Sequence, residues 1–139
     1  MKILLFGHNY QGSRLAQVHE VLQVLSRMKA SLAAHREFYE LLSREWPDVC
    51  QSIEPIDCCS DYPADMALSI GGDGTFLRAA EKIGDRGIPV LGVNIGRLGF
   101  LADVPAEETA AVLTEILEGR YKIEDRSVLH GEVGCLLAA

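Results

Sequence analysis

The sequence predicts an α/β fold, in which a mostly parallel sheet carries helices on both faces. Short apolar runs alternate along the chain with stretches whose apolar residues recur at spacings of three and four, as in βαβ units. Two glycine-rich turns, at 71–75 and 94–99, directly follow two of the apolar runs. Because ligands of parallel sheets lie beyond the carboxyl ends of the strands, we expect both turns to lie side by side there.

The first half of the chain contains two predicted strands, each followed by an amphipathic helix. The predicted elements are a strand over 2–6, a helix over 13–29, a strand over 31–35 and a helix over 37–46. Ser13 is a residue type that favours the N-cap of a helix. Pro47 ends the second helix because proline lacks the N–H that the helix would need.

The second half follows the same alternation after a proline-rich stretch over 47–65, which we expect to be mostly loop. The predicted elements are an edge strand over 53–56, a strand over 66–70, a helix over 75–84, a strand over 88–93 and a helix that begins at Pro105. Gly119 is expected to end that last helix. Residues 121–133 are expected to be extended.

The turn Gly71-Gly72-Asp73-Gly74-Thr75 is the strongest chemical signal. Its glycines let a ligand approach the backbone, and the helix after it directs unpaired N–H groups toward the turn, which suits phosphate. The turn is neither a Walker A loop nor a G-x-G-x-x-G turn. Asp73 would repel phosphate, so it needs another role. It could take a proton from a hydroxyl, hold a divalent metal, or accept hydrogen bonds from a substrate's hydroxyls.

A second motif identifies a family that the chain resembles. Residues 89–104 read PVLGVNIGRLGFLADV, and residues 117–129 read LEGRYKIEDRSVL. Together with GGDGT at 71–75, these segments resemble the NAD kinases that use ATP or polyphosphate. The resemblance is close over 66–130 and extends to 1–65 only in the order of the elements. Lipid kinases of the diacylglycerol and sphingosine type share the first motif, but the segment that follows it differs in them.

The resemblance implies a Rossmann-like N-terminal domain of a two-domain kinase. Residues 1–125 would form the α/β nucleotide-binding domain, and residues 126–139 would begin a β-rich second domain that is largely absent from this sequence. The implied reaction transfers a phosphoryl group from ATP or polyphosphate to the 2′-hydroxyl of the adenosine ribose of NAD, which gives NADP. We expect the 139 residues alone to be inactive.

The resemblance also assigns roles to residues of the two motifs. Asp73 would be the catalytic carboxylate, and the set that binds NAD and the phosphoryl donor would be Gly72, Asp73, Gly74, Thr75, Phe76, Arg78, Asn94, Gly96 and Arg97. Thr75 could instead cap the helix, and Phe76 could be a core aromatic residue. Arg78 could equally be a solvated surface cation.

Composition and resemblance together indicate the cofactors and partners. A divalent ion such as Mg²⁺ is implied as cofactor, without a metal site built by the protein. The net charge of −7 argues against nucleic acid as a partner, and no apolar run is long enough to span a membrane. A cytoplasmic homo-oligomer is implied. Two alternatives stay open, a lipid kinase that shares the GGDGT turn and a nucleotide-binding module without activity.

Overall fold

A computed structural model of the chain describes residues 1–96, 99–102 and 104–125. Within these residues, six parallel strands form one sheet in the order β3-β2-β1-β4-β5-β6. The strands are β1 (Lys2–Phe6), β2 (Ser31–His35), β3 (Ile53–Ile56), β4 (Met66–Gly71), β5 (Val90–Asn94) and β6 (Val104–Pro105). The predicted parallel sheet is therefore confirmed, and β3 lies at its edge as expected.

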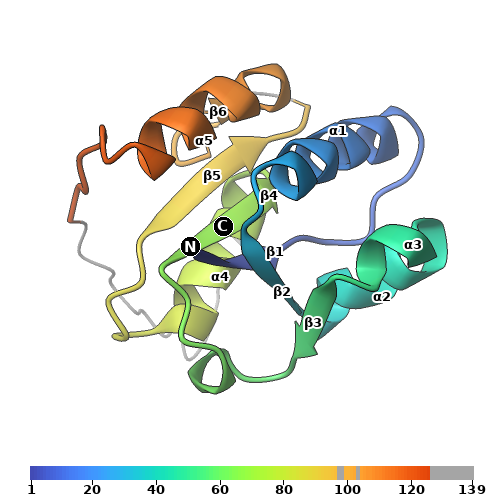
Figure 1. The fold of residues 1–139 in the computed structure, drawn as a ribbon, viewed down its shortest axis with the longest axis horizontal. Helices are drawn as coiled ribbons and strands as arrows, with labels where there is room; N and C mark the ends of the chain where they lie inside the picture. The colour runs from blue at the N-terminus through green and yellow to red at the C-terminus, as the bar shows by residue number, and fades with distance from the viewer. Residues whose placement is uncertain (97–98, 103, 126–139) are drawn as a thin grey trace, which may run out of the picture.

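Helices cover both faces of the sheet, as predicted. They are α1 (Ser13–Arg27), α2 (Arg36–Glu45), α3 (Pro47–Cys50), α4 (Asp73–Ile83) and α5 (Thr109–Leu117), with short 3₁₀ turns at Cys59–Asp61 and Ala106–Glu108. Figure 1 shows α1 and α5 side by side in front of the strands, while α4 lies behind them. No helix of the described residues is long and apolar enough to cross a membrane.

Two apolar cores separate the helices from the sheet. The larger core joins side chains of α1, α2 and α5 to one face of the strands, and Leu22, Phe38, Leu68 and Leu113 are fully buried in it. The smaller core lies on the opposite face, where α4 packs through Ala79 and Ile83. Burying one such large side chain stabilises the fold by about 1.5–3 kcal/mol, so these contacts hold the helices on the strands.

The structure corrects the expectation that 47–65 is mostly loop. Pro47 does not only end a helix, because it is also the first residue of α3, where its missing N–H has no cost. A 3₁₀ turn follows at Cys59–Asp61. Pro105 ends β6 and is also the N-cap of the 3₁₀ turn Ala106–Glu108, which continues into α5 at Thr109, so the predicted helix begins one residue later than expected and as a 3₁₀ turn.

Three further boundaries differ from the prediction. Gly12, and not Ser13, occupies the N-cap of α1. Helix α4 begins at Asp73, two residues earlier than expected, so that Asp73 belongs to the first helical turn. Residues 121–125 form no regular strand, and the rest of the predicted extended stretch lies outside the described residues.

The two glycine-rich turns lie next to each other. Strands β4 and β5 pair in parallel register up to Gly71 and Asn94. The backbone N–H of Ile95 then donates to the carbonyl of Gly71 at 2.9 Å, one residue beyond the paired strands. The predicted placement of both motifs at the carboxyl edge of the sheet is thus confirmed.

Candidate functional site

The first turn of α4 brings a carboxylate and free backbone amides to the carboxyl end of β4. Gly72 is the N-cap in an extended conformation, and no side chain caps the helix. The first N–H groups of the helix therefore remain available to a ligand, and the helix dipole adds partial positive charge there. Asp73 is half-buried and Gly74 is exposed on this turn. The arrangement suits a phosphate beside a hydroxyl.

The carboxylate of Asp73 is held by a loop that follows the second motif. The backbone N–H of Phe100 donates to Oδ2 of Asp73 at 2.9 Å. The N–H groups of Leu101 and Ala102 both donate to Oδ1, at 2.9 and 3.1 Å. We refer to residues 99–102 as the anchor loop. Hydrogen bonds from its Phe100, Ala102 and Leu101 amides lower the pKa of Asp73 because they stabilise the ionised form.

Gly99 of the anchor loop leaves room for the carboxylate of Asp73. A methyl group on Gly99 would overlap the carboxylate of Asp73. The other end of the loop is fixed on β5, where Nδ2 of Asn94 donates to the carbonyl of Ala102 at 2.9 Å. Asn94 is only 4% exposed. Its Oδ1 has no hydrogen-bond partner within the described residues, so it keeps an acceptor next to the loop.

Tyr10, from the loop after β1, fixes the start of the GGDGT turn. Its hydroxyl donates to the carbonyl of Ile70 at 2.7 Å and lies 3.3 Å from Oγ1 of Thr75. A side chain on Gly71 would overlap both hydroxyls, so only glycine fits at that position. Burial raises the pKa of Tyr10, which favours the neutral donor. Thr75 is buried in the third helical position and does not cap α4.

Two arginines carry positive charge near this edge. Nη1 of Arg78 lies 3.8 Å from the position that a Cβ of Gly74 would occupy, so its side chain turns back toward the start of α4. Nε and Nη2 of Arg14, on α1, lie at the same distance from the corresponding position at Gly96. The φ angle of Gly96 is 110°, which only glycine adopts readily. Neither arginine forms a salt bridge with a carboxylate of the described residues.

The aromatic residues of the two motifs face different surroundings. The ring of Phe76 lies over Gly92 of β5, with Cδ2 2.9 Å from the position that a Cβ there would occupy. Phe76 is half-buried, in keeping with a packing role. Phe100 is 95% exposed, although its amide binds Asp73. An aromatic side chain left in solvent beside a polar site offers a flat surface to a nucleotide base.

Sequence reasoning found part of this arrangement. Of the predicted binding residues, the structure brings together Gly72, Asp73, Gly74, Thr75, Arg78, Asn94 and Gly96. Arg97 lies outside the described residues. Tyr10, Arg14, Gly99 and Phe100 were not singled out. The exposed Phe100 and Gly99 belong to the second motif, but Tyr10 and Arg14 carry no local signal, since only the tertiary fold brings them to the turn.

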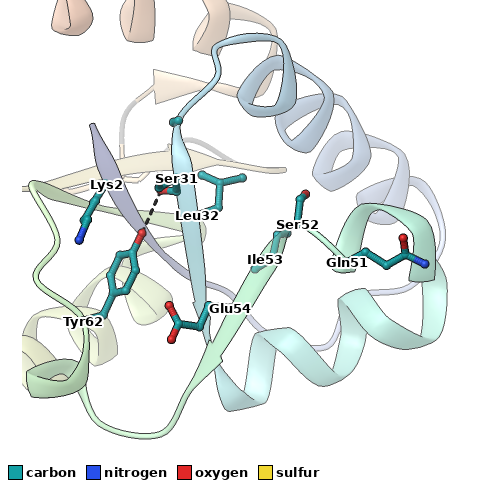
Figure 2. A pocket seen from close by; sticks show the side chains of 9 residues that line it. Lys2, Ser31, Leu32, Gln51, Ser52, Ile53, Glu54 and Tyr62 are labelled. Carbon is teal, nitrogen blue, oxygen red and sulfur yellow. Dashed lines mark hydrogen bonds between the residues drawn. The ribbon is translucent and has the colours of Figure 1, made fainter.

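A hollow of about 550 Å³ lies at the opposite edge of the sheet, as Figure 2 shows. It is lined from the amino ends of β1, β2 and β3, among others by Lys2, Glu54 and Tyr62. The hydroxyl of Tyr62 donates to the carbonyl of Ser31 at 3.1 Å. Because ligands of parallel sheets bind at the carboxyl ends of the strands, we place the functional site at Asp73 and not in this hollow.

Comparisons of the sequence with known proteins identify one family. A family model described as the ATP-NAD kinase N-terminal domain matches residues 6–121. The NAD kinase of Bacteroides fragilis is 40% identical over 131 residues, which are 93% of this chain and 44% of that protein. The NAD kinase of Porphyromonas gingivalis is 38% identical over 92% of this chain and 44% of its own length. The chain thus spans less than half the length of these curated relatives.

Comparisons of the structure support the same fold. A crystal structure of yeast NADH kinase complexed with NADH aligns with 86% of this chain and 38% of its own, at a TM-score of 0.69 and 20% identity. A crystal structure of an NAD kinase from Archaeoglobus fulgidus in complex with ATP aligns over the same shares, at a TM-score of 0.54 and 23% identity. At such identities the likeness is one of fold.

Proposed function

Because this chain belongs to the family of ATP-NAD kinase N-terminal domains, we propose that the full-length protein is an NAD kinase. It transfers the terminal phosphoryl group of ATP, or of polyphosphate, to the 2′-hydroxyl of the adenosine ribose of NAD. The products are NADP and ADP, or a shortened polyphosphate. Residues 1–125 form its α/β nucleotide-binding domain in this proposal, and residues 126–139 begin the β-rich second domain.

The observation that carries the proposal is the ionised carboxylate of Asp73 on an uncapped helix start. The same helical turn offers N–H groups to phosphate and an acceptor to a hydroxyl. A transferase that joins these two groups needs both within reach of each other. Asp73 is the residue that we assign to the 2′-hydroxyl, and the backbone of Gly72 and Gly74 is the part that we assign to the nucleotide.

Positive charge near the turn supports a polyphosphate donor. The protein is acidic overall, with a net charge of −7, so local groups must bind the anion. Arg78 turns back toward the start of α4, and Arg14 lies beside Gly96 of the second turn. We assign both arginines to the phosphates, together with Arg97. We propose that Asn94 and Gly96 give the second turn the conformation in which it faces the phosphates of the donor.

The exposed side chain of Phe100 supports the binding of a nucleobase next to Asp73. Its exposed ring is available for stacking, whereas the ring of Phe76 packs over Gly92. Of the two aromatic residues, we therefore favour Phe100 as the contact for the adenine of NAD. The role that the sequence suggested for Phe76 stays a prediction.

We propose that a divalent ion such as Mg²⁺ enters on the donor's phosphates. Within the parts of the chain that the structure describes, no group of three His, Cys, Asp or Glu could hold a metal ion. Asp73, moreover, already accepts three amide N–H groups. Magnesium is commonly bound by substrate phosphates, waters and only one or two carboxylates. The proposal therefore needs no metal cage built by the protein, and the ion would neutralise charge on the phosphates.

The reaction is a displacement at phosphorus. The 2′-oxygen of NAD forms a bond to the terminal phosphorus, and the bond from that phosphorus to the bridging oxygen breaks with its electron pair leaving on ADP. The hydroxyl proton is released to water as the new bond forms. Enzymes accelerate this chemistry mainly by positioning and by stabilising charge. Asp73 would hold the hydroxyl, while the helix amides and arginines would hold the donor.

An assay of the full-length protein tests the proposal. We expect NADP to form from NAD, ATP and Mg²⁺, as measured with an NADP-specific dehydrogenase. Parallel reactions with polyphosphate as donor, and with diacylglycerol or sphingosine as acceptor, test the alternatives. Phosphate transferred to the lipid alone would overturn the assignment. Nucleotide binding without any product would indicate a non-catalytic module.

Three further parts of the proposal rest on likeness and composition alone. We propose a homo-oligomer in the cytoplasm, without a nucleic-acid partner. The acidic net charge supports the last point, because nucleic-acid binding needs a basic surface. Light scattering on the full-length protein measures its oligomeric state, and a binding assay at low salt tests whether it binds nucleic acid. Microscopy of the tagged full-length protein tests its location in the cell.

A further inference from the structure

We propose that the anchor loop, residues 99–102, is a positioning element that leaves Asp73 one open acceptor site for a substrate hydroxyl. Gly99 is the residue that makes this arrangement possible. Asp73 then acts by orienting the hydroxyl and not by removing its proton early. The identity of the hydroxyl rests on the proposed function, but the arrangement of the carboxylate does not.

The number of hydrogen bonds at each oxygen of Asp73 carries the inference. A carboxylate has about four acceptor positions, two on each oxygen. Oδ1 accepts from Leu101 and from Ala102, so both of its positions are filled. Among the described residues, Oδ2 accepts from Phe100 alone. A ligand hydroxyl would therefore bind at Oδ2, in the one position that these residues leave open.

The same hydrogen bonds make Asp73 a weak base. The three donors are backbone amides, which cannot rotate to suit a protonated carboxyl group as hydroxyl donors could. The pKa of Asp73 is accordingly held below its usual range. General-base catalysis works best when the pKa of the base is near the working pH. A carboxylate with a lowered pKa is better suited to hold a hydroxyl in line with the phosphorus.

The position of the anchor loop does not depend on Asp73 alone. The Asn94 side chain binds the carbonyl of Ala102. Gly92 of β5 also lies against Ala102, because a Cβ added to Gly92 would come 2.7 Å from Cα of Ala102. Contacts with strand β5 thus fix the position of the anchor loop, and the loop in turn fixes the orientation of the Asp73 side chain. Substitutions at Gly99 or Gly92 should therefore change the orientation of the Asp73 carboxylate while Asp73 itself is retained.

Kinetics of the full-length protein provide the first test. We expect Gly99→Ala to lower kcat about 100-fold, the loss typical of a group displaced by about 1 Å. The KM for ATP should change by less than about threefold, because the backbone of α4 is untouched, whereas the KM for NAD should also rise, because Phe100 belongs to the displaced loop. Gly92→Ala displaces the same loop from the side of β5 and should act in the same direction. Thermal melting verifies that each variant is folded.

Gly119→Ala is the matched control. Its new methyl group meets open space, but its φ of 79° is strained for alanine, so it should lose stability and retain kcat. If kcat falls in all three variants in proportion to their melting temperatures, the loop has only a structural role and the inference is wrong. Unchanged kcat in folded Gly99→Ala would also overturn it.

A titration provides a readout that does not need activity. In protein labelled with ¹³C at aspartate carboxyl groups, the Asp73 signal and the amide protons of Phe100, Leu101 and Ala102 should titrate together. Their common midpoint should lie below the ordinary value of about 3.9 and should rise in Gly99→Ala. Independent titration of carboxyl and amides would reject the inference. If the wild type makes no NADP, the proposed function fails, while this titration still decides whether the loop holds the carboxylate.

Discussion

Asp73 differs from the exposed acidic side chains of the surface in the kind of partner it has. Asp57, for example, pairs with the guanidinium of Arg36, and both side chains are largely exposed. Such a surface ion pair contributes little stability because water and salt screen it. The partners of Asp73 are three amides of one loop, so its removal changes the conformation of the loop as well as the local charge.

We expect Asp73→Asn in the full-length protein to retain the fold and to lose at least about 100-fold in turnover, within the range of an acid–base or hydroxyl-binding group. The asparagine amide would present N–H groups to the amides of the anchor loop, so the melting temperature should also fall. Glu81→Gln is the matched control, since it removes an exposed carboxylate from the same helix. Wild-type turnover in folded Asp73→Asn would remove Asp73 from the mechanism.

The lowered pKa of Asp73 also predicts a pH dependence of stability. A carboxyl group with a lower pKa in the folded state contributes stability above its unfolded pKa, about 3.9, and loses it as the pH falls through the folded value. The difference in unfolding free energy between wild type and Asp73→Asn should therefore be constant above about pH 5 and shrink below about pH 4. Urea unfolding at a series of pH values measures it. A difference that grows in acid would contradict the assignment.

Arg14 should act on the donor and not on NAD. We expect Arg14→Gln to raise the KM for ATP about two- to tenfold, the effect of one hydrogen bond worth about 0.5–1.5 kcal/mol. The KM for NAD should stay within twofold of the wild type, on the order of experimental scatter. Arg27→Gln, at the other end of the same helix, is the matched control. Equal effects of both variants would point to net charge and exclude a local contact.

At the scale of elements, the alternation of strands and helices was predictable because apolar spacing follows directly from burial. Strand β2 followed only from the alternation, since the alanines of Ser31–His35 by themselves favour a continued helix, and yet the segment forms a strand between β1 and β3. Helix α3 could not be predicted, because four residues are too few to show a period. Asp73 was expected before its helix, since Gly72 and Gly74 on either side of it suggest a longer turn.

Tyr10 links the loop after β1 to the GGDGT turn, and this link is testable. Tyr10→Phe removes the donor to the Ile70 carbonyl, so we expect a loss of about 1–3 kcal/mol in unfolding free energy for the unpaired buried acceptor. Chemical denaturation measures this loss. Tyr121→Phe is the control, because its ring is exposed. If Tyr10→Phe and Tyr121→Phe are equally stable, the buried hydrogen bond contributes nothing measurable.

At the scale of the molecule, the site combines residues from three separate parts of the chain. The sequence identified Asp73 and the second motif, and their shared edge followed from the parallel topology. The hydrogen bonds between Asp73 and residues 100–102 could not be predicted, because their donors are backbone amides, whose positions depend on the path of the loop and not on its side chains. Arg14 and Tyr10 escaped detection for the same reason, since their distance from the turn is set by the crossover through α1.

We expect the 139-residue chain alone to form no NADP from NAD and ATP, whereas the full-length protein does. The chain matches the N-terminal domain of the family and spans 44% of the length of the curated relatives compared above. If the proposed site is built from two domains, this part of it should retain weak nucleotide binding at most. Coupled assays of both proteins at equal concentration measure the difference. Turnover by the short chain would show that residues 1–139 hold a complete site.

Both borders of the sheet are protected against pairing with another chain. On one border, β3 contains Pro55, which lacks a backbone donor and makes the strand a poor template. On the other, β6 consists of Val104 and Pro105, so it is very short and also contains proline, and among the described residues only β5 pairs with it. Edge-to-edge joining of two such sheets is therefore disfavoured, and a contact between two copies would have to use other surfaces.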